Sequence, residues 1–359
     1  MITARKEIDL NALRHNFAIV QQHCPSNKII AVVKGNAYGH DAVLVAQTLT
    51  RADAFAVARI EEAITLRQAG IRQPIVLLEG CFCMDDLAIA ARENFYTLIQ
   101  GPEQLQDFLH AKLPQPLHVW LKVDTGMHRI GVFPEQVPSY VKAIEASANC
   151  LGHVGFVSHF YEADQLNITT THRQLDCFVQ ATSAFPGERS LSNSAGSLYW
   201  RDAHFDWVRP GIALYGISPR EDSSGETEGL LPVMTLKSKL IAIRDQKAGQ
   251  SVGYGGIWTA EQDTRMGVIA MGYGDGYPRL APAGTPVLIN GRKVPVAGRI
   301  SMDMMTVDLG PDSQDRVGDD VILWGKGLPA EEVARHIGTI AYELVIKLTP
   351  RVTSQIISS

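Results

Sequence analysis

Short apolar runs alternate with amphipathic stretches between Ile29 and Tyr215. The first run, Ile29–Val33, has five apolar residues and is followed by Lys34 and Gly35, which is typical of a strand buried on both faces of a parallel sheet. Seven more candidate strands follow: Ala54–Ala58, Pro74–Leu78, Tyr96–Ile99, Leu117–Val123, His153–His159, Ser190–Asn193 and Gly211–Tyr215. Helical patterns lie between most of them: Asp41–Leu49, Ile60–Gln68, Met84–Arg92, Glu103–His110, Glu135–Ser147 and Thr171–Phe185.

Eight strands that alternate with helices predict an α/β fold with a closed (β/α)8 barrel of the TIM type. An earlier helix, capped by Asp9, presents Leu10, Leu13, Phe17 and Val20 on one face. An open doubly wound sheet is the alternative fold, but no G-x-G-x-x-G follows the first strand.

The pattern changes near Pro219. The segment Pro219–Gly229 is polar and rich in turn formers, which is typical of a linker. Strand-like runs follow the linker at Met234–Arg244, Met266–Met271, Thr285–Ile289, Val294–Val296, Met304–Leu309 and Val321–Trp324. Between the third and fourth runs, Asn290-Gly291 is a signal for a type I′ hairpin turn. Two short helices are expected at Val333–Ile337 and Ala341–Leu348. We therefore expect a barrel domain at 1–218, a linker at 219–230 and a mainly β C-terminal domain at 231–359.

Composition narrows the class of protein. The chain has 359 residues, of which 45% are hydrophobic and 20% charged, as in ordinary globular enzymes. Its formal net charge of -5 indicates neither a nucleic-acid partner nor an anionic membrane surface. We expect no membrane span, and no signal peptide beginning at Met1–Lys6. The five cysteines are scattered along the chain, which is typical of reduced thiols in a cytoplasmic protein. Cys81 and Cys83 have no second pair or histidine cluster, so no metal site is expected.

Candidate chemistry begins with Lys34, at the C-terminal end of the first strand, where α/β barrels place their active sites. Partial burial disfavours the charged form of a lysine and makes it a usable base or nucleophile, although it could also extend into solvent. After strand seven come Asn193 to Ser197, which are small residues with hydroxyls, and next to strand eight comes Arg209-Pro210-Gly211-Ile212. Loops at those two strands commonly bind phosphate in barrels.

The segment Val32–His40, VVKGNAYGH, resembles the lysine motif of the alanine racemases, in which that lysine holds pyridoxal phosphate as a Schiff base. The family's usual form is KANAYGH, so Gly35 is a small departure. The resemblance runs over nearly the whole chain. It implies a barrel that binds pyridoxal 5′-phosphate through Lys34.

The same resemblance assigns the cofactor phosphate to Ser194, to the amides of Gly211 and Ile212, and to the Tyr38 hydroxyl. Some family members add a C-terminal tyrosine where this chain has Pro350, so that contact is expected to be absent. The family arginine that matches Arg209 faces the pyridine nitrogen. A guanidinium remains protonated and can only donate, so it should keep that nitrogen unprotonated and suppress transamination.

Two further segments match family residues at the ends of strands five and six. In LKVDTGMHRIG, Arg129 matches the arginine that contacts the substrate carboxylate. Lys122 matches a lysine that many members carry as a carbamate, which would orient Arg129; the alternative is an unmodified lysine that is paired with Asp124 or exposed. His159 resembles the histidine that connects the catalytic tyrosine to Arg209.

The second domain supplies three more matches. Tyr254, within SVGYGG, matches the second catalytic base, on the cofactor face opposite Lys34. Tyr273, within GYGDGY, matches the tyrosine that lines the access passage, and the Met302 amide in SMD matches a contact to the substrate carboxylate.

The resemblance thus implies a two-base alanine racemase that interconverts L-alanine and D-alanine and either supplies D-alanine for peptidoglycan or degrades it. It also implies a head-to-tail homodimer in which Lys34 of one chain and Tyr254 of the other share a site. A racemase of broader range, acting on lysine, arginine or serine, stays open. A barrel-type decarboxylase would have a glycine-rich phosphate loop and a cysteine-containing substrate turn, and a non-catalytic pyridoxal phosphate carrier would lack the second domain.

Overall fold

The computed structural model describes residues 4–165 and 168–357. The chain divides into two compact units. The barrel unit contains residues 17–37 and 41–214, and the β unit contains residues 4–16, 38–40 and 215–357. This division differs at the N-terminus from the expected barrel range of 1–218, because the first residues belong to the β unit.

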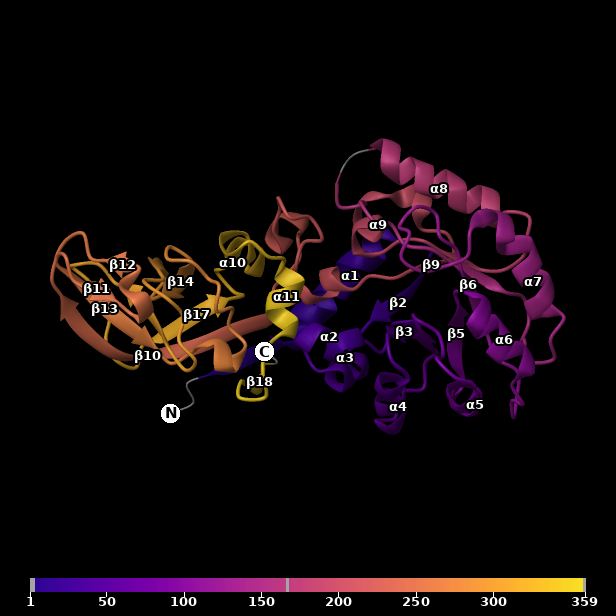
Figure 1. The fold of residues 1–359 in the computed structure, drawn as a ribbon, viewed down its shortest axis with the longest axis horizontal. Coiled ribbons are helices and arrows are strands. Elements are labelled where there is room, and N and C mark those ends of the chain that lie inside the picture. The colour runs from indigo at the N-terminus through magenta and orange to yellow at the C-terminus, as the bar shows by residue number, and fades with distance from the viewer. Residues whose placement is uncertain (1–3, 166–167, 358–359) are drawn as a thin grey trace. The chain divides into compact units, whose positions relative to one another are not determined.

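Eight parallel strands close the barrel, as predicted (Figure 1). They are β2 (Lys28–Val32), β3 (Ala54–Val57), β4 (Ile75–Leu77), β5 (Phe95–Ile99), β6 (Val119–Lys122), β7 (Gly155–Val157), β8 (Arg189–Ser190) and β9 (Trp207–Val208). Pairing of β9 with β2, at Lys28↔Trp207 and Ile29↔Val208, completes the ring. All five residues of the apolar run 29–33 are buried, as expected for a strand covered on both faces.

The predicted eighth strand at Gly211–Tyr215 was wrong. The strand is β9, and Ile212–Tyr215 forms a 3₁₀ helix, η3. The Pro210 carbonyl still accepts the Val32 amide, with 3.0 Å between N and O, as in a regular ladder of strand hydrogen bonds. Proline has no N–H to continue the pairing, so the strand ends there. The correction places Arg209 directly after a barrel strand and Gly211 in the loop that follows.

Helices cover the outside of the barrel (Figure 1). Those of the barrel unit are α3 (Ala42–Thr48), α4 (Ile60–Gln68), α5 (Met84–Glu93), α6 (Pro102–His110), α7 (Val137–Glu145), α8 (Ile168–Thr182) and α9 (Ser194–Tyr199). The chain between α1 and α3 adds α2 (Lys34–Gly39), and 3₁₀ turns lie at η1 (Pro134–Gln136) and η2 (Arg201–Ala203). Helix α1 (Leu10–His23) begins after Asp9, whose Oδ1 accepts the amides of Asn11 and Ala12, as its predicted cap. Within 4–165 and 168–357, none of the helices has the length and apolar character needed to cross a membrane.

The β unit is built on an eight-stranded sheet in the order β15-β14-β17-β10-β1-β18, with β13 paired to β10 and β16 to β13 (Figure 1). The strands predicted from sequence are β10 (Met234–Gln246), β13 (Thr264–Ile269), β14 (Pro286–Ile289), β15 (Arg292–Pro295), β16 (Met305–Asp308) and β17 (Asp320–Trp324). The remaining elements are the pair β11 (Ser251–Val252) and β12 (Trp258–Thr259), the helices α10 (Ala330–Ile337) and α11 (Ala341–Ile346), and the 3₁₀ turns η4 (Gly225–Glu228), η5 (Tyr254–Gly256) and η6 (Tyr273–Asp275).

Two strands of this sheet were not predicted, β1 (Arg5–Asp9) and β18 (Thr353–Ile357). Strand β1 lies between β10, to which it is antiparallel, and β18, to which it is parallel. Its sequence RKEID lacks a clear alternation of apolar and polar residues. Only pairing with segments more than 200 residues away makes it a strand, so local pattern could not predict it.

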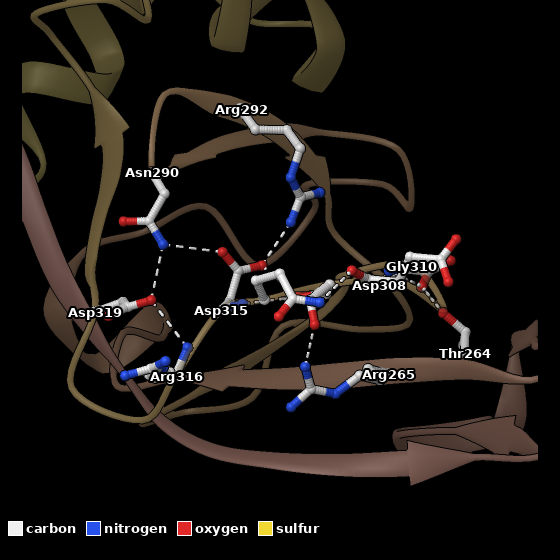
Figure 2. A network of polar contacts seen from close by, with 12 residues as sticks. Thr264, Arg265, Asn290, Arg292, Asp308, Gly310, Asp315, Arg316 and Asp319 are labelled. Atoms are coloured by element: carbon white, nitrogen blue, oxygen red, sulfur yellow. Dashed lines mark hydrogen bonds and ion pairs between the residues drawn. The ribbon is translucent and has the colours of Figure 1, made fainter.

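The predicted hairpin at Asn290-Gly291 is confirmed, with φ of +48° and +76° as a type I′ turn requires. Figure 2 shows how this hairpin is tied to the loop after β16. Asn290 Nδ2 donates to Asp315 Oδ1 at 3.0 Å and to Asp319 Oδ2 at 2.8 Å, and Arg292 Nη2 lies 2.5 Å from Asp315 Oδ2. The buried Asp315 carboxylate therefore anchors the distal turn of the sheet.

Candidate active site

Lys34 lies two residues after the end of β2 and opens a turn of uncommon backbone geometry. The five residues Gly35 to Gly39 have φ between +52° and +82°, so α2 is left-handed. Each non-glycine residue in that region costs roughly 1–2 kcal/mol, and consecutive ones are rare. The predicted glycine-bracketed turn is confirmed, but Asn36, Ala37 and Tyr38 share its strained geometry. Strain of this kind persists where neighbouring structure enforces it, and it is concentrated at functional sites.

Glu62 of α4 is one neighbour that holds this turn, and the sequence analysis missed it. Its Oε1 accepts the Gly35 amide at 2.6 Å, and its Oε2 accepts the amides of Ala58 and Arg59 at 3.0 and 3.1 Å. A glutamate at the third position of a helix is an expected partner for the amides at that helix's own start. Nothing in the local pattern indicates that its other oxygen reaches the residue after Lys34.

Burial lowers the pKa of the Lys34 ammonium, and the positive charges of Arg129 and Arg209 lower it further. The carboxylates of Glu79 and Glu62 act in the opposite direction and raise it. The net direction is downward, so the neutral amine is more accessible than in a free lysine. This supports the sequence-based expectation of a nucleophile or base at this strand end.

Lys122 ends β6 and is almost fully buried. Burial first, then repulsion from Arg209 and Arg129, lowers its pKa to about 7, while Asp124 acts to raise it. A buried amine with such a pKa is largely uncharged just above neutral pH. Lys122 at the end of β6, Arg129 in the loop that follows it and Arg209 after β9 thus influence one another electrostatically at the carboxyl ends of barrel strands.

The loop after β6 is organised by Asp124. Its Oδ1 accepts the amides of Gly126 and His128, both at 3.0 Å, and its Oδ2 lies 3.0 Å from His128 Nδ1. These bonds lower the pKa of the Asp124 carboxyl against the opposing effect of burial, which is the largest single influence. The closed loop leaves the Arg129 side chain exposed. An exposed arginine on a rigid loop is well suited to bind a carboxylate.

Arg209 is buried directly after β9 and is fixed by four contacts. Its Nη1 donates to Ser190 Oγ at 2.6 Å, and its Nη2 donates to Ser158 O at 2.6 Å and to Leu191 O at 3.4 Å. Nη2 also lies 3.4 Å from His159 Nδ1. Burial lowers the Arg209 pKa to about 10, so the guanidinium is still protonated near neutral pH.

His159 lies two residues after β7, beside Arg209. Its pKa lies well below the ordinary histidine value because of burial, and the charges of Arg209, Lys122 and Arg129 add to that effect. The ring is therefore neutral, and its Nδ1 can accept a hydrogen bond from Arg209 Nη2. The Arg209 side of the predicted connection is present as this 3.4 Å contact, and the connection to Tyr254 stays a prediction.

Gln174 of α8 is a second residue that sequence reasoning missed. It is buried, and its Nε2 donates to the carbonyl of His159 at 3.1 Å and to Thr125 Oγ1 at 3.3 Å. Its Oε1 accepts the Tyr161 amide at 3.1 Å. One amide side chain thus joins the loops that follow β6 and β7. A lone glutamine in a helix carries no local signal of this role.

Ser194 begins α9 and meets the loop after β9. Its Oγ accepts the amides of Gly211 at 2.9 Å and of Ala213 at 3.3 Å. An oxygen that accepts two N–H groups has its own O–H available to donate. The Asn193 side chain caps the helix by accepting the Gly196 amide at 2.9 Å. The two loops predicted to bind phosphate are therefore joined, and Gly211 already donates to Ser194.

Tyr38 falls in the β unit by its contacts. Its ring packs 5.1 Å from that of Tyr215 and 6.0 Å from that of Tyr342, measured between centroids. Burial raises its pKa to about 12, so the phenol stays protonated and can donate a hydrogen bond. This suits the phosphate-binding role expected of it.

Three other predicted residues belong to the β unit and lie on turns. Tyr254 is on η5 between β11 and β12, where Gly253, Gly255 and Gly256 all have positive φ, and its side chain is 70% exposed. Tyr273 is on η6 and Met302 on the turn before β16; both are partly exposed. The exposure leaves all three side chains accessible to a ligand or a second subunit.

The cysteines carry no metal site in the described part of the chain. All five are free thiols. Cys81 is buried, accepts a bond from Thr97 Oγ1 at 3.4 Å, and has its pKa raised to about 12 by burial, so it is a thiol and not a thiolate. No group of three or more histidine, cysteine, aspartate or glutamate side chains in residues 4–165 and 168–357 could hold a metal ion.

Comparison with known proteins agrees with this geometry. The profile of the alanine racemase N-terminal domain matches residues 8–219, and that of the alanine racemase C-terminal domain matches residues 233–356. The alanine racemase of Vibrio atlanticus is 56% identical to the chain, over 99% of each sequence. The alanine racemase of Aliivibrio salmonicida is 54% identical, over 99% of this chain and 100% of the relative.

Solved structures agree with the sequence relatives. The biosynthetic alanine racemase of Pseudomonas aeruginosa superposes with a TM-score of 0.96 at 45% identity, over 99% of this chain and all of the other. The alanine racemase of Acinetobacter baumannii gives a TM-score of 0.94 at 35% identity, over the same shares. The resemblance predicted from the motifs is confirmed, and the chain belongs to the alanine racemase family of isomerases.

Proposed function

We propose that this protein interconverts L-alanine and D-alanine with pyridoxal 5′-phosphate, using Lys34 and Tyr254 as the two bases. The observation that carries the proposal is Lys34 itself, a partly buried lysine with a lowered pKa at the carboxyl end of a barrel strand. Family membership over the whole chain supports alanine as the substrate.

The side chains near Lys34 fit the proposed cofactor. Lys34 offers an amine for the covalent link, Ser194 offers an O–H for a phosphate oxygen, and buried Arg209 offers a permanent cation for the ring nitrogen. The Tyr38 phenol and the Ile212 amide would add phosphate contacts, and Gly211 would contribute through Ser194 or directly. Pyridoxal phosphate, when bound, supplies an electron sink for negative charge at the substrate Cα.

Arg209 would tune that sink. Its guanidinium can only donate protons, and the bonds to Ser190 and Ser158 hold it in one orientation. With the guanidinium facing the ring nitrogen, Arg209 would keep that nitrogen unprotonated and would limit how much charge the ring withdraws. Return of the proton to Cα would then be preferred, which would favour racemisation over transamination.

Each base would act on one face of Cα. Lysine and tyrosine have reference pKa values of about 10.4 and about 10, so both need lowering to act near neutrality. Burial and two arginines provide this for Lys34. For Tyr254 we propose the path from Arg209 to neutral His159, in which His159 accepts from Arg209 and presents its other ring nitrogen to the phenol.

Substrate binding would use three residues. The Arg129 guanidinium and the Met302 amide would bind the alanine carboxylate, and Tyr273 would line the passage to the site. We further propose that Lys122 is carbamylated. A pKa of about 7 leaves much of its amine neutral, which is the form that reacts with carbon dioxide, and the resulting negative charge would neutralise repulsion and orient Arg129.

The proposed enzyme is a cytoplasmic homodimer with sites shared between subunits. Lys34 belongs to the barrel unit and Tyr254 to the β unit, and Tyr254 is 70% exposed in the single chain. A large exposed tyrosine on a glycine-rich turn suits insertion into the barrel mouth of a partner. We propose that the physiological role is to supply D-alanine for peptidoglycan. A D-alanine auxotroph that expresses this chain should then grow in medium that lacks D-alanine.

Assay of the pure protein with L- and D-alanine tests the function. We expect a yellow protein that racemises alanine in both directions. Lys34→Ala should lose the colour and nearly all turnover, whereas Lys28→Ala, an exposed lysine of the same strand, should keep both. Borohydride reduction followed by peptide mapping should label Lys34, and a label on another lysine would overturn the assignment. Faster turnover of lysine, arginine or serine than of alanine would favour the broader racemase.

A further inference from the structure

Two turns of the β unit, Gly272–Tyr277 and Ser301–Asp303, are joined through their backbones. The Tyr273 amide donates to Ser301 O at 3.0 Å, and the Gly274 amide donates to Met302 O at 2.8 Å. A Cβ at Gly272 would overlap the carbonyl oxygens of Ser301 and Met302, so glycine permits the close approach. The residues proposed to line the passage and to bind the substrate carboxylate therefore lie on one assembly.

Arg351 bridges the same two turns through its side chain. Its Nε lies 3.2 Å from Asp275 Oδ1 in the first turn, and its Nη2 lies 2.8 Å from Asp303 Oδ1 in the second. A Cβ at Gly274 would collide with Nη1, so this glycine makes room for the guanidinium. The planar guanidinium with several fixed donors suits two carboxylates at once, which a lysine could not match.

The Asp275 end of the bridge is buried. The Asp275 side chain is 4% exposed, and its Oδ2 accepts the Gly272 amide at 2.9 Å. Removing the cation from a buried carboxylate lowers the free energy of unfolding far more than removing it from an exposed one, because water does not replace the lost partner. The Asp303 end is exposed, so by itself it would contribute little. Anchoring at Asp275 is what allows Arg351 to restrain Asp303.

The chain that carries Arg351 is also fixed to the first turn. The Thr349 amide donates to Asp275 O at 3.0 Å, and Thr349 Oγ1 donates to Gly274 O at 2.9 Å. Pro350, which lies between Thr349 and Arg351, restricts the backbone before Arg351. The guanidinium thus extends from a pre-organised segment toward Asp303.

We propose that Arg351 is a positioning residue that sets the place of the Met302 amide relative to Tyr273 and so controls alanine binding. This inference rests on the proposed roles of Met302 and Tyr273. Without Arg351, Asp303 is released and the turn that presents the Met302 amide is less ordered. The carboxylate contact is made both before and during reaction, so its loss raises KM with little change in kcat.

The chain offers a matched control in Arg292 of the network in Figure 2. Arg292 is also half-exposed, in the same unit, and pairs with a buried carboxylate, Asp315, at 2.5 Å. Its partners hold the β14–β15 hairpin and the loop after β16, which contain none of the proposed site residues. A general loss of stability should therefore appear in Arg292→Gln as well as in Arg351→Gln.

Kinetics of the holoenzyme test the proposal. Arg351→Gln should raise the KM for alanine about tenfold to a hundredfold, with kcat within about threefold of the unmodified protein. Arg292→Gln should lower the melting temperature similarly and leave KM unchanged. Arg351→Lys should give an intermediate KM. Combining Asp303→Asn with Arg351→Gln should raise KM by less than the product of the separate effects, because both remove one contact.

Two readouts separate positioning from general damage. Guanidinium ion, at concentrations too low to unfold the protein, should lower the raised KM of Arg351→Ala because it can replace the missing side-chain group. Urea at the same concentration should not lower that KM. Hydrogen exchange should quicken at the amides of Tyr273 and Gly274 in Arg351→Gln and not in Arg292→Gln, and this requires no activity. Unchanged exchange and KM in Arg351→Gln would overturn the proposal. An unmodified protein inactive on alanine would instead overturn the proposed function.

Discussion

The amide nitrogen of Gly35 lies 2.6 Å from Oε1 of Glu62, so a glutamate of helix α4 holds the residue that follows Lys34. The other Glu62 oxygen accepts the amides of Ala58 and Arg59. One carboxylate therefore links the start of α4 to a left-handed turn that is strained on its own. The turn that begins at Lys34 is therefore held by a residue from another element.

Glu62→Gln should destabilise the protein and alter Lys34. A glutamine directs its NH₂ at one of the amides that Glu62 accepts, which should cost about 1–3 kcal/mol in the free energy of unfolding. Since the Glu62 charge raises the Lys34 pKa, its removal should move the midpoint of Lys34 acylation in the cofactor-free protein to lower pH. Glu61→Gln, an exposed neighbour in the same first turn, should change neither. Equal urea midpoints for Glu62→Gln and Glu61→Gln would contradict the role.

Arg209→Glu should change which reaction the enzyme performs. A carboxylate in place of the guanidinium would accept a hydrogen bond from the protonated ring nitrogen of bound pyridoxal phosphate, which favours that protonated form and strengthens the electron sink. Racemisation should fall while pyruvate formation by transamination rises relative to it. The ratio of the two rates in one sample is the measurement, because it does not depend on how much protein is folded. A ratio equal to that of the unmodified protein would remove Arg209 from the ring.

Lys122 should make stability depend on pH. Its pKa falls from about 10.4 in the unfolded chain to about 7 in the folded one, so between those values the unfolded state binds more protons. The free energy of unfolding should then rise with pH from about 7 to about 10, by up to about 1.4 kcal/mol per pH unit. The measurement is the difference between the unmodified protein and Lys122→Met, in buffers freed of bicarbonate, since other groups cancel. A difference that is flat with pH would contradict the lowered pKa.

Carbon dioxide should modify the same lysine. In ¹³C-labelled bicarbonate the protein should give a carbamate resonance that Lys122→Met lacks. Lys112→Met, which removes an exposed lysine of the barrel unit, should retain it. A resonance that persists in Lys122→Met would place the carbamate elsewhere.

Mixed dimers should recover activity from two inactive parents. If Lys34 and Tyr254 in one site come from different subunits, a dimer of Lys34→Ala with Tyr254→Phe has one site with both changes and one with neither. Activity should then increase in proportion to the fraction of mixed dimers, which differently tagged chains can report. Mixed dimers that form and stay as inactive as the parents would refute the shared site.

Elements whose signal is local could be predicted from the order of their residues alone. Buried runs such as Ile29–Val33 specify strands because apolar residues on both faces suit only a covered sheet. Helix α4 has the bounds predicted from its periodicity, and Asn290-Gly291 specified its hairpin because those residues tolerate positive φ. Lys34 could be placed at a barrel rim for the same reason, since a strand and its end are read from neighbouring residues.

Tertiary structure decided whatever depends on residues far apart in the chain. Strand β1 exists only because β10 and β18 lie on either side of it. The left-handed turn after Lys34 needs Glu62 from another helix. The lowered pKa of Lys122 needs burial and the charges of Arg129 and Arg209 together. Solvent exclusion and Coulomb interactions act through space, so no local pattern of residues contains them.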